Sequence, residues 1–411
     1  MRERVSLKAL TALFIAWMAY LLSFIDRLSW PPIMPLASKD LAINSTQAGG
    51  LMTAFYIGYV ITQFPGGLLV DRYGYRKVLL TSFLAMGSFT LFTGFAHSYE
   101  QAFLVRVLVG IGSGAIFSSS VSAIFDWFPE NRRGTAMGLF MTSTSLGVFV
   151  VNLFVPTVAE EYGWRAAFYV SGTLPLIALI FAYFFLKERT PVSQRLKEKS
   201  RVNVFQDTLS LFKNRNLMIA GLAGFCALWG TWGTATWANT YLNQSLELPL
   251  VQAGAIMSLY GVAGLLCKPI IGIISDYVNR TTILFCAFLL FAPTLLWFGL
   301  NQNVSLLYFL TPVLGVTAFV YSPVMNTLIG QLVDKRLVGT ATGFVNTIWQ
   351  LGSLLSPLAV GAVIDATSNY FLGFAMLAAG PALAAIIISF IKMEKSETVI
   401  NQETEQSKLS S

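Results

Sequence analysis

The sequence predicts an all-α integral membrane protein whose 12 transmembrane helices form two six-helix bundles related by pseudo-two-fold symmetry. Three observations predict this fold class. Of the 411 residues, 55% are hydrophobic and 11% are charged, with a mean hydropathy of +0.65, whereas a soluble domain carries about 25% charged residues. Apolar stretches of about 20 residues, long enough to cross a bilayer, recur along the chain. Motifs also recur at one fixed offset, and a soluble globular enzyme is excluded.

The apolar stretches follow one another in chain order, separated by short polar turns. The first follows a basic N-terminal segment. Because its hydrophobicity continues to Leu36 and no small-residue cleavage site ends it, we interpret it as a membrane span rather than a signal peptide. The expected spans lie near residues 9–36, 46–70, 75–95, 99–124, 134–158 and 166–186, and then near residues 215–241, 249–274, 281–300, 304–330, 339–364 and 369–391. This even number places both termini on one side.

The distribution of Lys and Arg predicts which side that is. Of the 27 such residues, Lys39 and Arg165 fall in loops on the opposite side, and Arg27, Arg106 and Lys268 fall inside spans, so 22 lie on the side of the termini. Basic residues are retained in cytoplasmic loops. We therefore expect a multi-pass protein of the inner (plasma) membrane with both termini in the cytoplasm. This topology explains the net charge of +7 without a nucleic-acid partner.

The chain divides near its middle. Residues 187–214 form a long, strongly charged internal segment, which we interpret as a cytoplasmic linker between an N-terminal six-helix bundle (1–186) and a C-terminal one (215–392). A polar cytoplasmic tail (393–411) follows. The halves repeat at an offset of 205 residues: Gly67 and Asp71 in GGLLVDRYGYRKV correspond to Gly272 and Asp276 in IGIISDYVNRTTI, and residues 134–138 correspond to 339–343. Two matches at one offset indicate an internal duplication.

The segment GGLLVDRYGYRK resembles the signature loop between spans two and three of the major facilitator superfamily. That resemblance implies two parallel six-span halves that alternate access to a central site. It also implies that Asp71 pairs across the seam between the halves, near Gly339 at the start of span eleven, and holds one gate shut. The expected gating residues are Asp71, Arg72, Arg76 and Asp276. The basic residues among them also obey the positive-inside rule, which is a sufficient alternative explanation.

Four ionisable residues lie inside predicted spans, where a charge costs free energy and indicates a functional role. Asp26 and Arg27 lie in span one (SFIDRLSW), Arg106 in span four and Lys268 in span eight. Three cations against one carboxylate predict a site that attracts an anion. Arginine suits a planar carboxylate, which it can bind through two parallel hydrogen bonds. In the plainer alternative, Arg106 extends its charged group to the outer membrane interface, and Lys268 extends to the inner interface or pairs with an aspartate near it.

The combination of FIDR in span one, YVITQFPGG in span two and Arg106 in span four resembles the anion:cation symporter family of that superfamily, which includes carriers for sugar acids. The resemblance implies that Arg27 anchors the substrate carboxylate and that Asp26 carries a proton. It further implies that Tyr59 and Asn346 hydrogen-bond the substrate and that Arg106 is a partner of the acids. The expected substrate-binding residues are Arg27, Tyr59, Arg106, Lys268 and Asn346.

One position departs from that family. Its members commonly have a glutamate two helical turns after the span-four arginine, and here the position is Ser113. The coupling stoichiometry is therefore open, as is the choice between a proton and sodium. For Asp26, desolvation favours the protonated form and Arg27 favours the ionised form. The sequence does not decide between the two.

Aromatic residues gather in span seven, at Trp229, Trp232 and Trp237. With Tyr260 and Trp349 they either line a cavity for a larger or aromatic substrate or fill the bundle core and the membrane interfaces. The sequence leaves both interpretations open.

The expected function is secondary active transport of a small organic anion, such as a sugar acid, by proton-coupled symport in a lipid bilayer, as a monomer and without a cofactor or metal. A drug/proton antiporter of the same fold is less favoured, because cationic drugs need buried acids and span five lacks the Gly-Pro pattern of those exporters. A substrate-sensing homologue is a further alternative. A membrane-embedded enzyme is not expected, since the chain has one histidine and neither an H-E-x-x-H motif nor a nucleophile elbow.

Overall fold

The computed structural model describes residues 6–189, 210–333 and 337–391, and the regular elements in these ranges are helices. The first bundle contains α1 (Leu7–Leu28), the short 3-10 helix η1 (Pro31–Ile33), α2 (Met34–Asp40), α3 (Ser45–Tyr73), α4 (Tyr75–Thr93), α5 (Tyr99–Gly114), α6 (Ile116–Trp127), α7 (Glu130–Tyr162) and α8 (Trp164–Phe185). The second contains α11 (Arg215–Gln244), α12 (Leu250–Ile274), α13 (Arg280–Leu300), α14 (Val304–Phe319), α15 (Tyr321–Leu332), α16 (Val338–Thr367) and α17 (Tyr370–Ile388). Most of the expected linker and all of the expected tail lie outside the described residues.

The helices account for the twelve predicted spans in their predicted order. Within the described residues, ten helical stretches are long and apolar enough to cross a membrane, and α3, which bends at Pro65, makes an eleventh. Three of these stretches contain a break, so α1 with α2, α5 with α6, and α14 with α15 each form one span. The twelfth is α4, in which Arg76 and Lys77 lower the mean hydropathy of an otherwise apolar helix.

Local sequence signals set where the helices begin and turn. Asn44 caps α3 in a capping box with Gln47, and Ser98 caps α5, so amides that lack an intrahelical partner are satisfied by side chains. Gly74 and Gly163 adopt positive φ angles of 86° and 84° at the turns after α3 and α7, a conformation that glycine takes without strain. These one-residue turns hold consecutive helices antiparallel.

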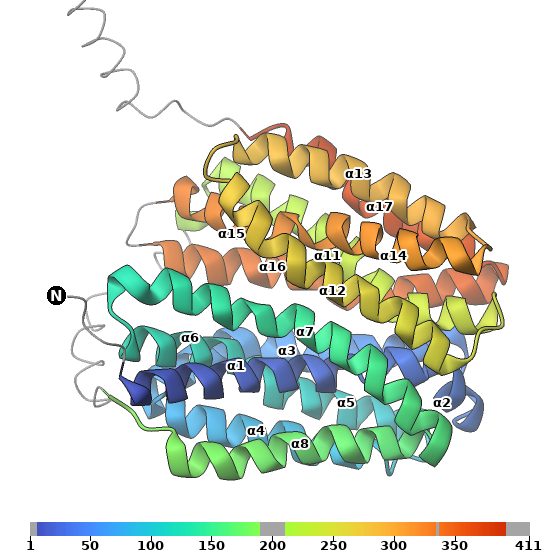
Figure 1. Cartoon of the computed structure of the whole chain (residues 1–411), viewed down its shortest axis with the longest axis horizontal. Helices are drawn as coiled ribbons and strands as arrows, with labels where there is room; N and C mark the ends of the chain where they lie inside the picture. Colours follow the sequence, from blue (N-terminus) through green and yellow to red (C-terminus); the bar gives the residue numbers. More distant parts are fainter. Residues whose placement is uncertain (1–5, 190–209, 334–336, 392–411) are drawn as a thin grey trace, which may run out of the picture.

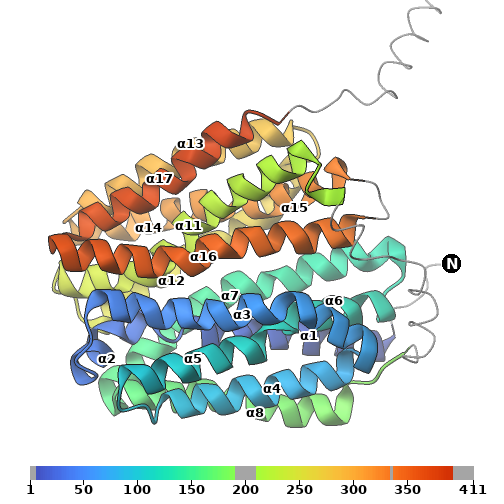
Figure 2. The ribbon, with the colours of Figure 1, turned by 180° about the vertical axis from the view of Figure 1, so that it is seen from behind.

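The two bundles lie side by side. Figure 1 shows α1–α8 in the lower half of the view and α11–α17 in the upper half, and the same separation is seen from behind in Figure 2. We call the end at which α1 and α11 begin, on the left of Figure 1, the terminal end, and the opposite end the distal end. At the distal end the bundles meet through two helix pairs, α3 with α16 and α7 with α12.

The two helix pairs are copies of one crossing. Gly49 on α3 lies against the backbone carbonyl of Pro357 on α16, and Gly254 on α12 lies against that of Asn152 on α7; a Cβ on either glycine would overlap the carbonyl. The two glycines are 205 residues apart, and so are Pro357 and Asn152. A pseudo-two-fold axis therefore relates the two halves of the chain, and the bundles make equivalent backbone-to-backbone contacts on both sides of it.

A carboxylate closes each crossing. Asp365, near the end of α16, accepts hydrogen bonds from the backbone N–H groups of Ser45 (2.9 Å) and Thr46 (2.7 Å) and from the Thr46 hydroxyl. Glu160, near the end of α7, accepts one from the backbone N–H of Val251 (3.2 Å). An anion is favourable at a helix N-terminus, and each bond here joins one bundle to the other. We call these two contacts the distal latches.

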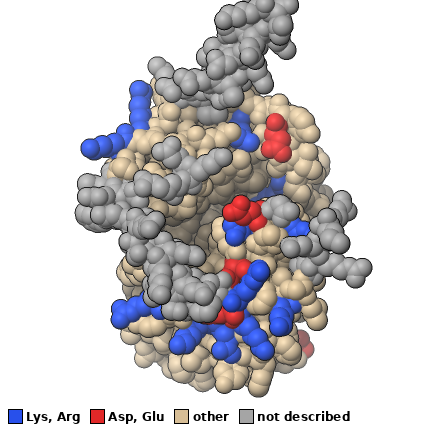
Figure 3. All heavy atoms as spheres, turned by 90° about the vertical axis from the view of Figure 1, so that its left-hand side faces the viewer, with Lys and Arg blue, Asp and Glu red and all other residues tan. Residues whose placement is uncertain are grey.

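The terminal end is open between the bundles. Six glycines near the terminal ends of the same four helices have no atom within 4 Å of the place a Cβ would take; they are Gly67, Gly134, Gly138, Gly272, Gly339 and Gly343. Figure 3 looks onto this end and shows it hollowed between the bundles, with Lys and Arg gathered over the first bundle. The molecule is therefore closed at one end and open at the other.

Candidate anion-binding site

Arg27 lies in the last turn of α1, and only 1% of it is exposed. Aromatic rings surround its guanidinium. The guanidinium carbon is 4.4 Å from the ring centroids of Phe24 and Tyr59, 5.2 Å from that of Phe55 and 5.5 Å from that of Tyr56. Phe55, Tyr56 and Tyr59 are all on α3. They can surround one cation together because residues three and four apart share one face of a helix. The cation is thus held by ring faces rather than by an acid.

The rings leave the hydrogen-bonding capacity of Arg27 unused. Its Nε and Nη2 atoms are buried and form no hydrogen bond with any described residue, and the Tyr56 hydroxyl nearby has none either. A buried donor without a partner carries its full desolvation penalty. A planar anion could accept two parallel bonds from such a guanidinium. Of the described residues, Arg27 is the one whose geometry best fits an anion anchor.

Arg106 is also fully buried, but its guanidinium is engaged by the backbone. Arg106 Nη1 donates to the backbone carbonyl of Asp26 at 3.0 Å, and Nη2 donates to that of Arg27 at 2.9 Å. These carbonyls lie in the last turn of α1, where no later amide of the helix can reach them. Arg106 on α5 therefore fixes the end of α1 and with it the direction of Arg27. Both guanidinium groups lie near the Phe55 ring, at 5.2 Å for Arg27 and 5.3 Å for Arg106.

The carboxylate of Asp26 forms no ion pair with Arg27 in the described structure. It is fully buried, neither oxygen forms a hydrogen bond with a described residue, and the groups that act on it electrostatically are Thr90 and Arg106. Ser113, where the related family commonly has an acid, is also fully buried, and its hydroxyl donates to the carbonyl of Val109 in its own helix. The Ser113 hydroxyl therefore has its hydrogen-bond partner within α5.

The charge of this site belongs to the first bundle. The positions 205 residues after Asp26, Arg27 and Arg106 are Thr231, Trp232 and Thr311. Trp232 lies at the seam, with its ring centroid 5.6 Å from that of Phe24. The pseudo-symmetric half therefore presents an aromatic residue where the first presents a cation, so the two bundles cannot bind the two parts of a ligand in the same way.

Lys268 reaches from the second bundle into the first. It is half-buried on α12, and its Nζ donates to the hydroxyls of Thr144 and Ser145 on α7, both at 2.8 Å. The ammonium also lies 5.0 Å from the ring centroid of Phe319. The structure thus brings Lys268 to the seam, with its ammonium bonded to the first bundle.

The other expected substrate contacts lie on α3 and α16. Tyr59 is 1% exposed and stacks on Phe55, and Asn346 is half-buried. Gln350 and Ser353 follow Asn346 on the same face of α16, are buried, and share a hydrogen bond of 3.1 Å. The sequence analysis missed this pair. Polar residues at helical spacing on an apolar span would have been the signal for it.

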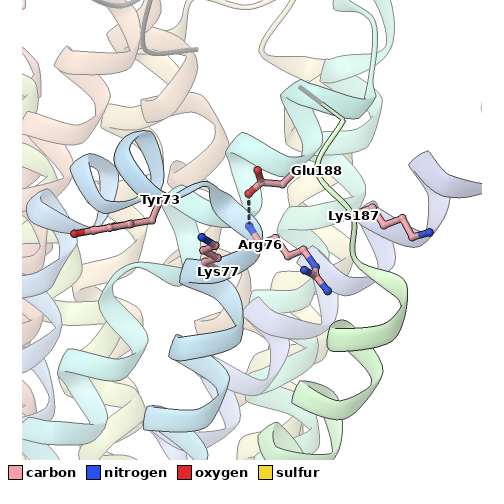
Figure 4. Close-up of a pocket in the computed structure, with 5 residues that line it drawn as sticks. All are labelled: Tyr73, Arg76, Lys77, Lys187 and Glu188. Carbon is pink, nitrogen blue, oxygen red and sulfur yellow. Dashed lines mark hydrogen bonds between the residues drawn. The ribbon is translucent and has the colours of Figure 1, made fainter. Parts of the chain in front are cut away.

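Two of the expected gating residues at the terminal end, Arg76 and Asp276, have partners within their own bundle. Arg76 donates to the backbone carbonyls of Leu186 (2.6 Å) and Tyr183 (2.7 Å), within its own bundle, and its backbone N–H donates to Glu188, as Figure 4 shows. Arg76 and Glu188 line a surface cavity of about 430 Å³ together with Tyr73, Lys77 and Lys187. Arg72 is exposed and lies over the Tyr73 ring, Asp71 is half-buried, and Asp276 is 3.7 Å from Arg280 on the next helix.

The chain is similar in sequence to known membrane transporters. A family model described as the Major Facilitator Superfamily matches residues 16–266 and 222–410. A probable sulfoacetate transporter of Cupriavidus necator is 27% identical, with 95% of both chains covered. The hexuronate transporter of Bacillus subtilis is 24% identical, covering 93% of this chain and 94% of the relative. A quinolone resistance transporter of Acinetobacter baumannii is also 24% identical, covering 96% of both.

Solved structures share the fold. A crystal structure of a bacterial homolog of the human lysosomal transporter Spinster, in an inward-facing and unoccupied conformation, matches with a TM-score of 0.75. The match covers 93% of this chain and 95% of that one at 15% sequence identity. At that identity the likeness concerns the arrangement of the helices alone.

Proposed function

Since the chain belongs to the Major Facilitator Superfamily, we propose that it is a secondary active transporter that moves a small organic anion, such as a carboxylate, by alternating access. One observation carries the proposal: the Arg27 guanidinium is buried near the seam with two donor atoms unbonded and no carboxylate paired to it among the described residues. A negatively charged solute would supply the missing acceptors. The names of two relatives, a sulfoacetate and a hexuronate transporter, support the same substrate class.

In this proposal Arg27 anchors the anion, and the other residues position it. Tyr59 lies over the guanidinium, and Asn346 approaches from the second bundle to hydrogen-bond the substrate. Arg106 acts through α1, whose end it holds. Because Arg27 is 1% exposed, one of the covering rings must tilt before the anion reaches it.

We further propose that transport is coupled to a proton carried by Asp26. This buried carboxylate forms no hydrogen bond with a described residue, so proton uptake would remove a charge that burial penalises. With Ser113 hydrogen-bonded inside its own helix, we propose one proton site in this region rather than two. The test is accumulation by the Asp26→Asn variant in proteoliposomes with an imposed pH gradient. Unchanged accumulation would remove the proposal, whereas exchange without accumulation would support it.

Orientation follows from the charge distribution. We propose that the terminal end, where Lys and Arg gather, faces the cytoplasm across the inner membrane of a bacterium. On that assignment, the linker and tail are cytoplasmic, and the conformation described here is open to the cytoplasm. We propose that a single chain, as in other two-bundle carriers, is the transporting unit.

The test of the anion site is uptake by purified protein in proteoliposomes. A panel of radiolabelled sugar acids, monocarboxylates, aromatic acids and sulfonates is offered, and the Arg27→Ala variant is expected to lose uptake and binding of each transported anion. Arg215→Gln is the matched control, because it removes an exposed arginine at the start of α11. Wild-type affinity in Arg27→Ala would rule out its anchoring role.

A drug/proton antiporter is the second candidate, which the quinolone-resistance relative favours. Such an exporter would bind its cationic drugs at buried acids. In the described part of the central region the buried acid is Asp26, which lies beside Arg106 and is therefore a poor site for a cation. The same proteoliposomes distinguish the two functions, because proton-driven export of an organic cation in the absence of anion uptake would favour the second.

A further inference from the structure

Lys268 carries a charge that the described protein leaves unmatched. None of the ion pairs among the described residues includes it. Its two hydrogen-bond partners, Thr144 and Ser145, are neutral hydroxyls. An ammonium has three N–H donors, so one donor has no partner among the described residues, and the positive charge is offset there by the Phe319 ring rather than by an acid. Half burial of such a group is unfavourable unless an anion pairs with it.

A row of aromatic rings connects Lys268 with Arg27. The ammonium lies over Phe319, the Phe319 ring is 6.2 Å from Trp232, and Trp232 is 5.6 Å from Phe24. Phe24 in turn lies 4.4 Å from the guanidinium of Arg27. All three rings are at least nine-tenths buried. The contacts that link the two cations are therefore aromatic, and they cross from one bundle to the other.

This arrangement favours a particular ligand chemistry. A cation at each end fits an anionic group at each end, and the rings between them fit an apolar or unsaturated middle. A polyhydroxylated chain would face two phenyl rings without hydrogen-bonding groups and one indole with a single N–H donor, so most of its hydroxyls would lack partners along this row. An anion with one charged group would leave the Lys268 charge unmatched.

We propose that Lys268 is a second anion-binding group and that the preferred substrate is an organic dianion whose two charged ends are separated by an apolar spacer. This inference rests on the proposed anion transport. Arg27 on α1 holds one end of the substrate and Lys268 on α12 holds the other, so the substrate joins the two bundles. Lys268 thereby determines specificity, while Arg27 is needed for every anion.

The experiment compares dianions with monoanions of the same length in proteoliposomes. Succinate, adipate and suberate are each paired with the corresponding straight-chain monocarboxylate, and apparent affinity is measured by competition against a transported radiolabelled anion. The wild type is expected to prefer the dianions. Lys268→Gln is expected to lower the apparent affinity for dianions by about tenfold or more, the usual effect of removing a charged hydrogen-bond partner, and so to reduce the ratio of dianion to monoanion affinity.

Two controls keep the result specific. Lys268→Arg keeps the positive charge and is expected to keep the preference for dianions, and Lys39→Gln removes an exposed lysine and is expected to change nothing. Monoanion uptake by Lys268→Gln shows that the variant is folded.

The outcomes separate this inference from the proposed function. The inference is overturned if the wild type shows no preference for dianions, or if Lys268→Gln weakens both series equally, because the lysine would then only join α12 to α7. Failure of uptake for every anion offered would instead contradict the proposed transport, and with it this inference.

Discussion

At the scale of single residues, two buried arginines of the same chemistry have different tasks. The Arg106 guanidinium donates through Nη1 and Nη2 to the last carbonyls of α1 and leaves Nε unbonded, whereas Arg27 is surrounded by rings with both Nε and Nη2 unbonded. The first arrangement stabilises a helix end, and the second leaves capacity for a ligand. The partner groups, and not burial or residue type, separate the two roles.

Arg106→Met tests this distinction. The variant leaves two buried carbonyls without donors and Asp26 without its nearby cation, so we expect the free energy of unfolding to fall by about 2–4 kcal/mol. Unfolding in mixed micelles, followed by tryptophan fluorescence, measures it. Thr311→Val is the control at the pseudo-equivalent position in the second bundle, and it should be nearly neutral because the Thr311 hydroxyl has no hydrogen-bond partner among the described residues. Unchanged stability with lost anion affinity would place Arg106 in the binding site instead.

The sequence could identify the charged residues in the membrane but not their partners. A charge in an apolar stretch is visible from composition alone, which is why Asp26, Arg27, Arg106 and Lys268 could be listed. Whether Arg106 meets a carbonyl, an acid or the seam depends on the rotation of α5 against α1, and that is set by packing along the whole helix. For the same reason the Gln350–Ser353 pair could not be anticipated.

At the scale of elements, the distal end is closed by helices in backbone contact. Span order and approximate bounds were predictable, because about 20 apolar residues are needed to cross a bilayer. The breaks between α5 and α6 and between α14 and α15 were not, since a break in an apolar span leaves the composition unchanged. The contact of α3 with α16 follows from glycines whose partners lie some 300 residues away in the sequence, as in the pair Gly49 and Pro357.

Gly49→Ala and Gly254→Ala should each disfavour the closed distal end. The added Cβ overlaps a carbonyl of the opposite bundle, and overpacking of this kind costs about 1–3 kcal/mol. We expect longer distances between spin labels placed on the distal ends of the two bundles. Gly134→Ala serves as the comparison, because its Cβ would meet no atom within 4 Å in this conformation, and an equal lengthening there would contradict the argument.

The distal latches should differ in strength. Asp365 accepts three hydrogen bonds from the opposite bundle and Glu160 accepts one, so Asp365→Asn should open the distal end more than Glu160→Gln. In a background in which the native cysteines are replaced, a cysteine is placed at Ser356, a buried position whose hydroxyl has no hydrogen-bond partner among the described residues. The rate at which a membrane-impermeant maleimide labels it reports this opening. The reverse order of rates would show that the hydrogen bonds do not control closure.

At the scale of the whole molecule, the duplication relates the two crossings, but it does not relate the charges. The pseudo-two-fold axis carries Gly49 onto Gly254 and Asn152 onto Pro357, whereas it carries Arg27 onto Trp232. The helix crossings that join the two bundles are therefore symmetric, whereas the charged residues of the candidate site are not. The sequence offset of 205 residues made the symmetry of the two halves predictable. That Trp232 of the second bundle lies beside Phe24 of the first could be seen only in the structure.

Transport by alternating access requires the terminal end to close. Gly138→Trp and Gly343→Trp place a large ring in space that is open in this conformation, so the protein should keep its stability and its anion binding while uptake is lost. Leu289→Trp, at a 53% exposed position on α13, is the control. Thermal stability, binding in detergent and uptake in proteoliposomes are measured together. Full uptake by both glycine variants would mean that these helices do not approach each other during the cycle.

The unequal latches determine how the molecule comes apart. At the distal rim the crossing of α7 with α12 has a single hydrogen bond, while that of α3 with α16 has three. Farther along the same crossing, Lys268 adds two bonds from α12 to α7, so the inequality concerns the distal rim. At the distal end, separation of the bundles would begin between α7 and α12, while α3 and α16 stay in contact and act as the hinge. A solute from the distal side would then enter obliquely, past α7 and α12, before it could travel down the molecular axis.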